Sequence, residues 1–315
     1  MNCIGIDTSC YTTSAACADG RSIVFSKRTM LSVPFGDRGL RQSDGVFQHL
    51  KQLSPLLTEL FETVDRTSVG AVAVSASPTS QKDSYMPVFL VGLQQARTLA
   101  AALGVPLIPV DHQSGHIRAA LYGNETLLER DRFFAVHISG GTTDVLLVEP
   151  HRDAPYSIGR IGVSTDLHAG QLVDRVGVAL GLPFPSGKHL ETLANEAASH
   201  DVKLASAVRD GDCSFSGAES AARRLLGRVP DAELAYGVYD CLARTLAKMF
   251  AHAQKTHGEL PFLICGGVAS SALLRKLIAE RFPGELYFGK PELSGDNAVG
   301  VALLGADRTG AIWKN

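Results

Sequence analysis

The sequence has no long hydrophobic run, no paired-cysteine motif and no excess of charge of either sign. No segment approaches the roughly 18 to 20 apolar residues of a membrane span, so we expect no membrane association. The amino terminus, MNCIGIDTSC, has no basic segment and begins at once with a β-type run, so we expect no signal peptide and a cytoplasmic protein. The formal net charge of −2 gives no general attraction to nucleic acid, so an RNA substrate would need a local basic patch or a partner protein.

The cysteines form no CxxC pair and lie mostly within apolar patterns. We therefore expect reduced, small core residues rather than disulfides or a metal cluster. The six are Cys3, Cys10, Cys17, Cys213, Cys241 and Cys265.

The length of 315 residues exceeds the usual size of a single core, so we expect two lobes. The composition is 45% hydrophobic and 20% charged, with 31 glycines. This is typical of an α/β protein with many tight turns near ligands.

Residues 105–116, VPLIPVDHQSGH, predict a strand that ends at Asp111 and passes directly into a helix. His112 and His116 then share one helix face, because residues four apart are neighbours on a helix surface. Two neutral imidazoles in this position can chelate a divalent ion. Two partly buried or solvated histidines would show the same spacing, so a third ligand is needed to decide.

Two segments repeat one pattern of strand, small polar tip and strand: IGIDTSCYTTSAA near the start and VHISGGTTDVLL in the second half. The repeat predicts two lobes built on the same hairpin. The first tip, DTSCYTT, offers hydroxyls and backbone N–H groups to an anion, although a plain polar hairpin is an equal alternative. In the second tip, Gly140 and Gly141 allow close backbone approach to an anion.

The remaining patterns alternate between strands and helices, as expected for a parallel or mixed sheet. We predict helices at 45–64 (kinked or interrupted at Pro55), 88–103, 164–180, 188–202 and 232–257, and strands at 70–76, 156–161 and 285–289. Arg223 and Arg224 lie on a helix whose charged face is either solvated or in contact with RNA.

Two further segments contain candidate ligand contacts. In PFLICGGVASSALLRKL, Gly266 and Gly267 follow a buried strand, so backbone could lie against a flat ligand such as adenine or direct a helix N-terminus at a phosphate. The segment does not contain GxGxxG, so a dinucleotide site is not predicted. In SGDNAVGVALLG, Asp296 is either a helix cap or an oxygen ligand of a metal.

The order of these motifs resembles that of the TsaD family of tRNA threonylcarbamoyladenosine transferases. The resemblance runs from Ile4 to about Gly305 through IGIDTSC, VDHQSGH, ISGGTT, GQLVDRVGVALGLPFPSG, SFSG, CGGVASSALLR and FGKPELSGDNA. It implies an α/β protein with the two-lobed actin and sugar-kinase type of ATPase fold and duplicated mixed-sheet domains. The implied N-terminal lobe spans residues 1–120 and is completed by a C-terminal helix at 295–310, and the implied C-terminal lobe spans 121–294.

The resemblance also implies that His112, His116 and Asp296 hold one iron or zinc ion, and we expect them to meet between the lobes. Such a donor set with open positions could polarise a carbonyl or phosphoryl oxygen. An adenine nucleotide, ATP or threonylcarbamoyl-AMP, is expected nearby, and Mg is a further candidate ion. With the first hairpin tip included, the expected nucleotide-binding residues are Asp7, Thr8, Ser9, Ile138, Ser139, Gly140, Gly141, Thr142, Asp174, Gly187, Gly266, Gly267 and Ser271.

The implied reaction transfers a threonylcarbamoyl group from an adenylate to the exocyclic amine of an adenosine in tRNA. The implied partners are tRNA and either the related actin-like and small ATPase proteins of the same pathway or a second copy of the chain. Two alternatives are carbamoyl or adenylate chemistry on a small-molecule acceptor and a non-catalytic nucleotide-binding scaffold. A peptidase is not predicted, because HxxxH lacks the adjacent glutamate of zinc proteases.

Several positions depart from the family pattern. Thr142 replaces the histidine of SGGHT, Leu167 replaces the second of two aspartates, and Gln171 replaces a glutamate. Ser271 replaces an asparagine, and SASPTSQKDSYMP replaces a GPG turn near residue 78. The expected metal ligands are therefore retained while acid and base groups are lost, so the sequence predicts a divergent family member and assigns no catalytic acid or base.

Overall fold

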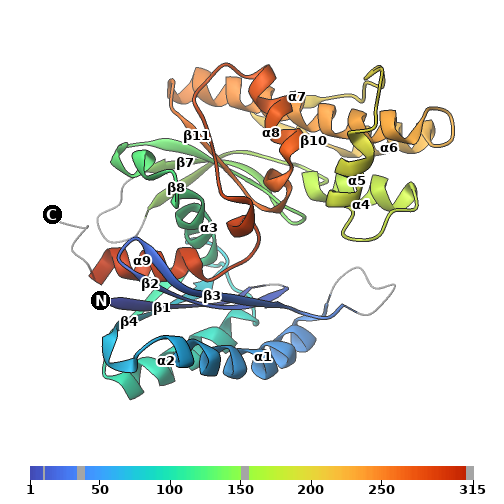
Figure 1. Cartoon of the computed structure of the whole chain (residues 1–315). Coiled ribbons are helices and arrows are strands. Elements are labelled where there is room, and N and C mark those ends of the chain that lie inside the picture. The colour runs from blue at the N-terminus through green and yellow to red at the C-terminus, as the bar shows by residue number, and fades with distance from the viewer. Residues whose placement is uncertain (10, 34–39, 150–155, 310–315) are drawn as a thin grey trace. The chain divides into compact units, whose positions relative to one another are not determined.

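The computed structural model describes residues 1–9, 11–33, 40–149 and 156–309 (Figure 1). The contacts divide the chain into two compact units. Of the described residues, the first contains those between Met1 and Tyr122 and those from Gly295 to Thr309. The second contains residues 123–149 and Tyr156–Ser294.

The first unit is built on a five-stranded sheet of order β3-β2-β1-β4-β5. Its strands are β1 (Asn2–Ser9), β2 (Thr12–Asp19), β3 (Ser22–Met30), β4 (Val69–Ser77) and β5 (Leu107–Asp111). The strands β1, β2 and β3 run antiparallel to one another, and β4 and β5 run parallel to β1.

Helices cover both faces of this sheet. On one face, α1 (Gln42–Thr63) and α2 (Phe89–Leu103) pack on Ile4 and Ile6 of β1. On the other face, α9 (Val299–Thr309) contacts β1, β2 and β4 and packs against α3 (His112–Leu121). Alternation of side chains along β1 explains the division, because successive residues point to opposite faces of a sheet.

The second unit repeats the plan with the order β12-β11-β6-β7-β8. The strands β6, β7 and β8 are antiparallel neighbours, and β11 and β12 run parallel to β6, which is the pattern of the first sheet. The bounds are β6 (Phe133–Ile138), β7 (Thr143–Glu149), β8 (Ser157–Val163), β11 (Phe262–Cys265) and β12 (Leu286–Phe288). The predicted duplication of a mixed sheet is therefore confirmed.

Five longer helices complete the second unit and share one large apolar core. They are α4 (Ala169–Ala179), α5 (Gly187–Ala194), α6 (Ser216–Leu225), α7 (Asp231–His257) and α8 (Ala272–Arg281). A two-stranded hairpin, β9 (Ala207–Arg209) and β10 (Asp212–Ser214), lies before α6.

One predicted alternative, an interruption at Pro55, and two predicted helix boundaries are corrected. The helix α1 continues through Pro55 without interruption. The helix predicted at 164–180 begins only at Ala169, because the Asp166 carboxylate accepts hydrogen bonds from Ser214 Oγ (2.5 Å) and from the backbone N–H of Phe215 (2.9 Å). Asp166 is thereby tied to the start of α6 and cannot lie on α4. The helix predicted at 188–202 ends at Ala194.

The helices α3 and α9 lie unusually close together. A Cβ added at Gly300 would lie only 1.8 Å from the carbonyl oxygen of Gly115, so the crossing requires glycine at this position. One turn farther along, Arg118 Nε donates to Asp307 Oδ2 at 2.6 Å, and both side chains are buried. Close contact and a buried ion pair together fix α3 relative to α9.

Five of the six cysteines, Cys3, Cys17, Cys213, Cys241 and Cys265, are buried and free, as predicted, whereas Cys10 lies outside the described residues. Burial raises the pKa of both Cys3 and Cys265 to about 12, so these thiols stay protonated at neutral pH. Of the helices that the structure describes, none is both long and apolar enough to span a membrane.

His49 on α1 makes the stability of the first unit sensitive to acid. Its fully buried ring lies with Nδ1 2.8 Å from Thr13 Oγ1, and that hydroxyl donates to Gln52 Oε1, so it accepts from His49 Nδ1–H. Burial lowers the pKa of His49 from 6.5 to about 4. As the pH falls through this range the unfolded chain gains a proton that the folded chain does not, so stability present above pH 6.5 is lost.

We expect the free energy of unfolding to fall by about 3 kcal/mol more in the wild type than in His49→Gln between neutral pH and about pH 4. Chemical denaturation at a series of pH values measures this difference, and carboxylates common to both proteins cancel. Parallel pH curves for the two proteins would contradict the assignment of His49 as a buried neutral imidazole.

Candidate metal centre

The two histidines are positioned by the start of α3. Strand β5 ends at Asp111, whose carboxylate accepts hydrogen bonds from the Ser114 backbone N–H (2.8 Å) and from Ser114 Oγ (2.7 Å). This cap begins the helix directly after the strand. His112 therefore occupies the first turn and His116 the next, on one face, with ring centroids 4.4 Å apart.

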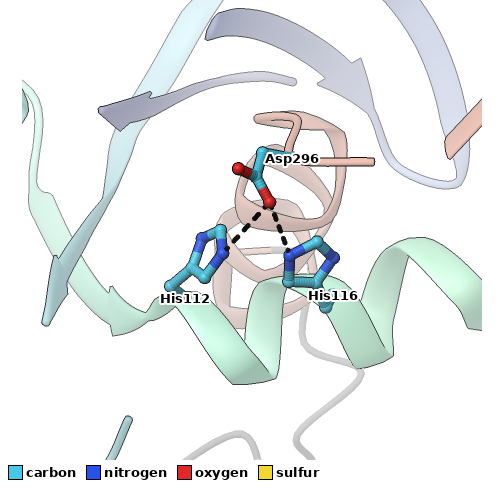
Figure 2. A group of neighbouring side chains, drawn as sticks. All are labelled: His112, His116 and Asp296. Carbon is cyan, nitrogen blue, oxygen red and sulfur yellow. Dashed lines mark hydrogen bonds and ion pairs between the residues drawn. The ribbon is translucent and has the colours of Figure 1, made fainter. Parts of the chain in front are cut away.

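Asp296 reaches the same place from the segment before α9, as Figure 2 shows. Its Oδ1 atom lies 3.2 Å from His116 Nε2 and 3.6 Å from His112 Nε2. The cap of α9 is supplied by Asn297, whose Oδ1 accepts from the Val299 backbone N–H at 3.0 Å. The neighbouring side chain thus fulfils the capping role, and the Asp296 carboxylate faces the two histidines instead.

These three side chains form one compact cluster, whose possible ligand atoms all lie within 4.8 Å of one another. All three belong to the first unit, so the cluster needs no side chain from the second. His116 is almost fully buried, whereas 28% of the Asp296 side chain is exposed. The cluster is therefore held by buried residues and remains open on the Asp296 side.

Asp7 orients His112 through the ring nitrogen Nδ1. It is completely buried on β1, with Oδ1 3.0 Å from His112 Nδ1, and its Oδ2 accepts from Ser9 Oγ at 2.5 Å. A carboxylate at Nδ1 holds the proton on that nitrogen and leaves the Nε2 lone pair for a ligand. Sequence analysis placed Asp7 in an anion-binding tip, and its pairing with a histidine 105 positions away was missed.

The two carboxylates are ionised in this environment. Burial by itself raises the pKa of Asp7, but the charge and hydrogen bond of His112 outweigh it and lower the pKa. Burial also acts to raise the pKa of Asp296, but the hydrogen bonds and charges of His112 and His116 outweigh burial and lower the pKa strongly. Burial lowers the pKa of His112, yet Asp7 and Asp296 raise it well above its ordinary value. Two negative groups therefore surround the imidazoles, a field that attracts a cation.

The donor set fits a divalent transition metal. Two imidazole nitrogens and one carboxylate oxygen suit zinc or ferrous iron and leave coordination positions for a ligand. Ligand atoms about 2.1 Å from a shared ion lie about 3 to 4 Å from one another. The separations of 3.2 Å and 3.6 Å already match that spacing, so small shifts would complete the site.

We expect Asp7→Asn to weaken zinc affinity by between about 10-fold and 100-fold, the usual effect of losing a carboxylate behind a ligand histidine. Competition with a chromophoric chelator measures the affinity. Asp65→Asn is a matched control, since Asp65 caps a short helix at the surface of the same unit. Equal affinities in wild type and Asp7→Asn would show that His112 needs no orienting carboxylate.

The glycine turns predicted to hold a nucleotide lie next to one another in the second unit. The tip Ser139–Thr142 joins β6 to β7, and Ser139 O accepts from the Gly170 backbone N–H at the start of α4 (3.1 Å). Gly266 has φ of +98°, and a Cβ there would lie 2.3 Å from Ile138 O. Glycine is required for this approach, which brings the turn after β11 against the end of β6.

The other predicted nucleotide residues of this unit lie on α4 and at the starts of α5 and α8. Asp174 Oδ1 accepts from the Ser186 backbone N–H (2.7 Å), beside Gly187, and burial raises the pKa of Asp174. Gly187 O accepts from Tyr239 Oη at 2.9 Å. Ser271 caps α8 by accepting from the Leu274 backbone N–H at 3.1 Å. These positions are thus fixed by local hydrogen bonds.

The first hairpin tip, with Asp7, Thr8 and Ser9, belongs to the first unit. Thr8 Oγ1 donates to Val88 O and accepts from the Gly92 backbone N–H, both at 3.0 Å. Its hydroxyl thus anchors the start of α2.

Two departures from the family pattern have structural roles. Leu167 is buried in the apolar core of the second unit, where a carboxylate would be costly. Gln171 Oε1 accepts from the His168 backbone N–H at 3.1 Å and so caps α4. Neither position supplies a titratable group.

The duplicated sheet, with helices inserted at equivalent points, defines the actin and sugar-kinase class of ATPase fold. A ROK family protein from Streptococcus pneumoniae superposes with a TM-score of 0.59 at 12% identity, covering 99% of this chain and 100% of that chain. HypF from T. kodakarensis gives a TM-score of 0.63 at 14% identity, covering 98% of this chain and 48% of that chain. These likenesses show the fold.

The chain belongs to the TsaD family, tRNA N6-adenosine threonylcarbamoyltransferase, whose profile matches residues 42–303. A relative of that name from Carboxydothermus hydrogenoformans is 30% identical over 320 residues, covering 97% of this chain and 91% of the relative. Another from Methanopyrus kandleri is 30% identical over 314 residues, covering 97% and 87%. The resemblance drawn from the motifs is confirmed.

Proposed function

We propose that the protein is a metal-dependent transferase that moves a threonylcarbamoyl group from an adenylate donor to the exocyclic amine of an adenosine in tRNA. The observation that carries this proposal is the cluster of His112, His116 and Asp296, with Asp7 behind it. Membership of the TsaD family supplies the reaction class.

In this proposal the three cluster residues hold one iron or zinc ion. The ion, when bound, would supply a Lewis acid for a carbonyl or phosphoryl oxygen of the donor. Asp7 keeps the His112 proton on Nδ1, and Asp111 fixes the helix start from which both rings project. The protein's part is to hold the donor atoms in place before any ligand arrives.

The adenine nucleotide is proposed to bind the glycine turns of the second unit. No atom lies within 4 Å of a Cβ built at Gly140, Gly141 or Gly267, so backbone there is open to a ligand. A Cβ built at Gly266 would instead lie 2.3 Å from Ile138 O. Gly266 therefore packs closely against the end of β6 and fixes the position of the neighbouring Gly267. Backbone N–H groups at such turns bind phosphate without a charged side chain.

In the transfer, a bond forms between the adenosine amine nitrogen and the carbamoyl carbon. The bond from that carbon to the phosphate oxygen breaks, AMP leaves, and the amine proton passes to solvent. The positions that usually hold carboxylates, Leu167 and Gln171, supply no base. Catalysis is therefore assigned to positioning and electrostatic stabilisation of the donor.

The test uses the full-length chain, the actin-like and small ATPase proteins expected as partners, ATP, threonine, bicarbonate and tRNA that lacks the modification. We expect threonylcarbamoyladenosine in the wild-type reaction and none with His116→Ala, measured by mass spectrometry of digested tRNA. Unchanged tRNA in the complete wild-type reaction would refute the proposal.

A small-molecule acceptor is the second candidate, favoured by the net charge of −2 and the absence of carboxylates at Leu167 and Gln171. It shares the donor chemistry, so both candidates require binding of an adenine nucleotide. A donor consumed at the same rate with and without tRNA would favour the small acceptor. A nucleotide-binding scaffold is disfavoured, because a scaffold needs no metal cluster.

A further inference from the structure

Arg28 lies in a row of residues that crosses the first sheet beside the metal cluster. Asp7 on β1 pairs with Ser14 on β2, and Ser14 pairs with Arg28 on β3. Directly paired residues of antiparallel strands place their side chains on the same face. Arg28 therefore projects from the face on which Asp7 contacts His112.

The guanidinium of Arg28 reaches the segment that carries the third cluster residue. Its Nη1 atom donates to the main-chain oxygen of Asp296 at 3.5 Å. A Cβ built on Gly295 would lie 2.9 Å from the same nitrogen, so glycine at 295 leaves room for the guanidinium. The long contact uses little of the hydrogen-bonding capacity of Arg28, which has five N–H donors.

Arg28 is also an exposed cation that no carboxylate neutralises in the part of the chain that the structure describes. The adjacent residue offers a comparison. Lys27 points to the opposite face of β3 and pairs with Glu59 of α1, with Nζ 2.6 Å from Oε1. Of these two neighbouring cations on β3, Lys27 is paired with a carboxylate, whereas the charge of Arg28 remains available beside the cluster.

The positive charge of Arg28 is important because of the charge balance in the proposed metal centre. Asp7 and Asp296 together carry two negative charges, which balance one divalent ion, and the two imidazoles are neutral when they act as ligands. The loaded cluster is then neutral, and Arg28 adds one positive charge at its edge. A planar guanidinium forms short, charge-assisted hydrogen bonds with carboxylates and phosphates.

We propose that Arg28 selects an oxyanion, a carboxylate or phosphate group, as the ligand of the open coordination position at His112, His116 and Asp296. This inference rests on the proposed metal centre. Arg28 is a specificity-determining residue: it holds the anionic group of the incoming molecule and leaves the binding of the ion to the three ligands.

The test measures anion binding to the full-length protein loaded with cobalt(II), whose visible absorption changes when a ligand enters its coordination sphere. Acetate, inorganic phosphate and neutral imidazole are titrated separately. We expect Arg28→Gln to weaken binding of at least one anion by about tenfold, since a charge-assisted hydrogen bond contributes about 1.5 kcal/mol or more. Arg28→Lys should retain most of the affinity, and imidazole binding should not change.

Lys27→Gln is the matched control, because it removes the same charge one residue away on the opposite face. It should bind each probe as the wild type does. The acetate and phosphate arms show which oxyanion is preferred.

Three results would overturn the inference. Unchanged anion affinity in Arg28→Gln, with cobalt bound normally, would refute the role of Arg28 alone. Loss of cobalt itself in Arg28→Gln would show that the guanidinium supports the metal ligands instead of selecting an anion. Failure of the wild type to bind cobalt would refute the metal centre, and this inference with it.

Discussion

Replacement of His116 by alanine is expected to lower the affinity for zinc or ferrous iron by more than about 100-fold. Loss of a residue that merely supports a ligand already costs between about 10-fold and 100-fold, and His116 is one of three direct ligands in the proposed site. Its ring is almost fully buried beside Asp296, so water cannot simply take over a preorganised position. Isothermal competition with a chelator measures the loss.

His189→Ala is the control for this prediction, because His189 is an exposed histidine on α5 in the second unit. It should bind the ion as the wild type does. Retention of wild-type affinity by His116→Ala would exclude this residue as a ligand and reduce the cluster to two groups.

Replacement of Gly300 by alanine is expected to destabilise the protein by about 3 kcal/mol, at the upper end of the usual cost of overpacking. The added Cβ would lie 1.8 Å from the Gly115 carbonyl oxygen. No rotamer change relieves a clash with backbone, so α3 and α9 must move apart. Since α3 carries His116 and Asp296 precedes α9, metal affinity should fall as well.

Gly217→Ala is the matched control, because a Cβ at Gly217 on α6 would meet no atom within 4 Å. It should leave stability unchanged or raise it by up to about 1 kcal/mol through helix propensity. Denaturant unfolding measures both variants. A Gly300→Ala protein as stable as Gly217→Ala would contradict the close crossing of α3 and α9.

Sequence patterns predicted the duplicated plan because each hairpin places apolar strands around a small polar tip. They missed β3, whose exposed edge residues alternate weakly and include both Lys27 and Arg28. A strand with one free edge needs no continuous apolar pattern. The two adjacent basic residues of β3 were the available signal for Arg28, the residue proposed to select an anion.

Helix ends were less predictable, because contacts distant in sequence decide them. Asp166 resembled part of a helix until its hydrogen bonds with Ser214 and Phe215 tied it to the start of α6. The buried pair of Arg118 and Asp307 joins residues 189 positions apart and left no local pattern. Such charges are normally predicted to face solvent.

At the candidate site, spacing alone predicted the pair His112 and His116, whereas it left Asp296 undecided between cap and ligand. That decision depended on whether Asn297 could cap α9, which only the conformation of this turn determines. The pairing of Asp7 with His112 depended on the sheet placing β1 near the start of α3. Roles set by local spacing were thus accessible, and roles set by packing were not.

The most direct test of the account is an anomalous diffraction map from crystals of the zinc-loaded, full-length protein. The account predicts one strong peak per chain, about 2.0 to 2.2 Å from His112 Nε2, His116 Nε2 and a carboxylate oxygen of Asp296. A peak bound by other residues, or no peak in crystals that contain zinc, would contradict it.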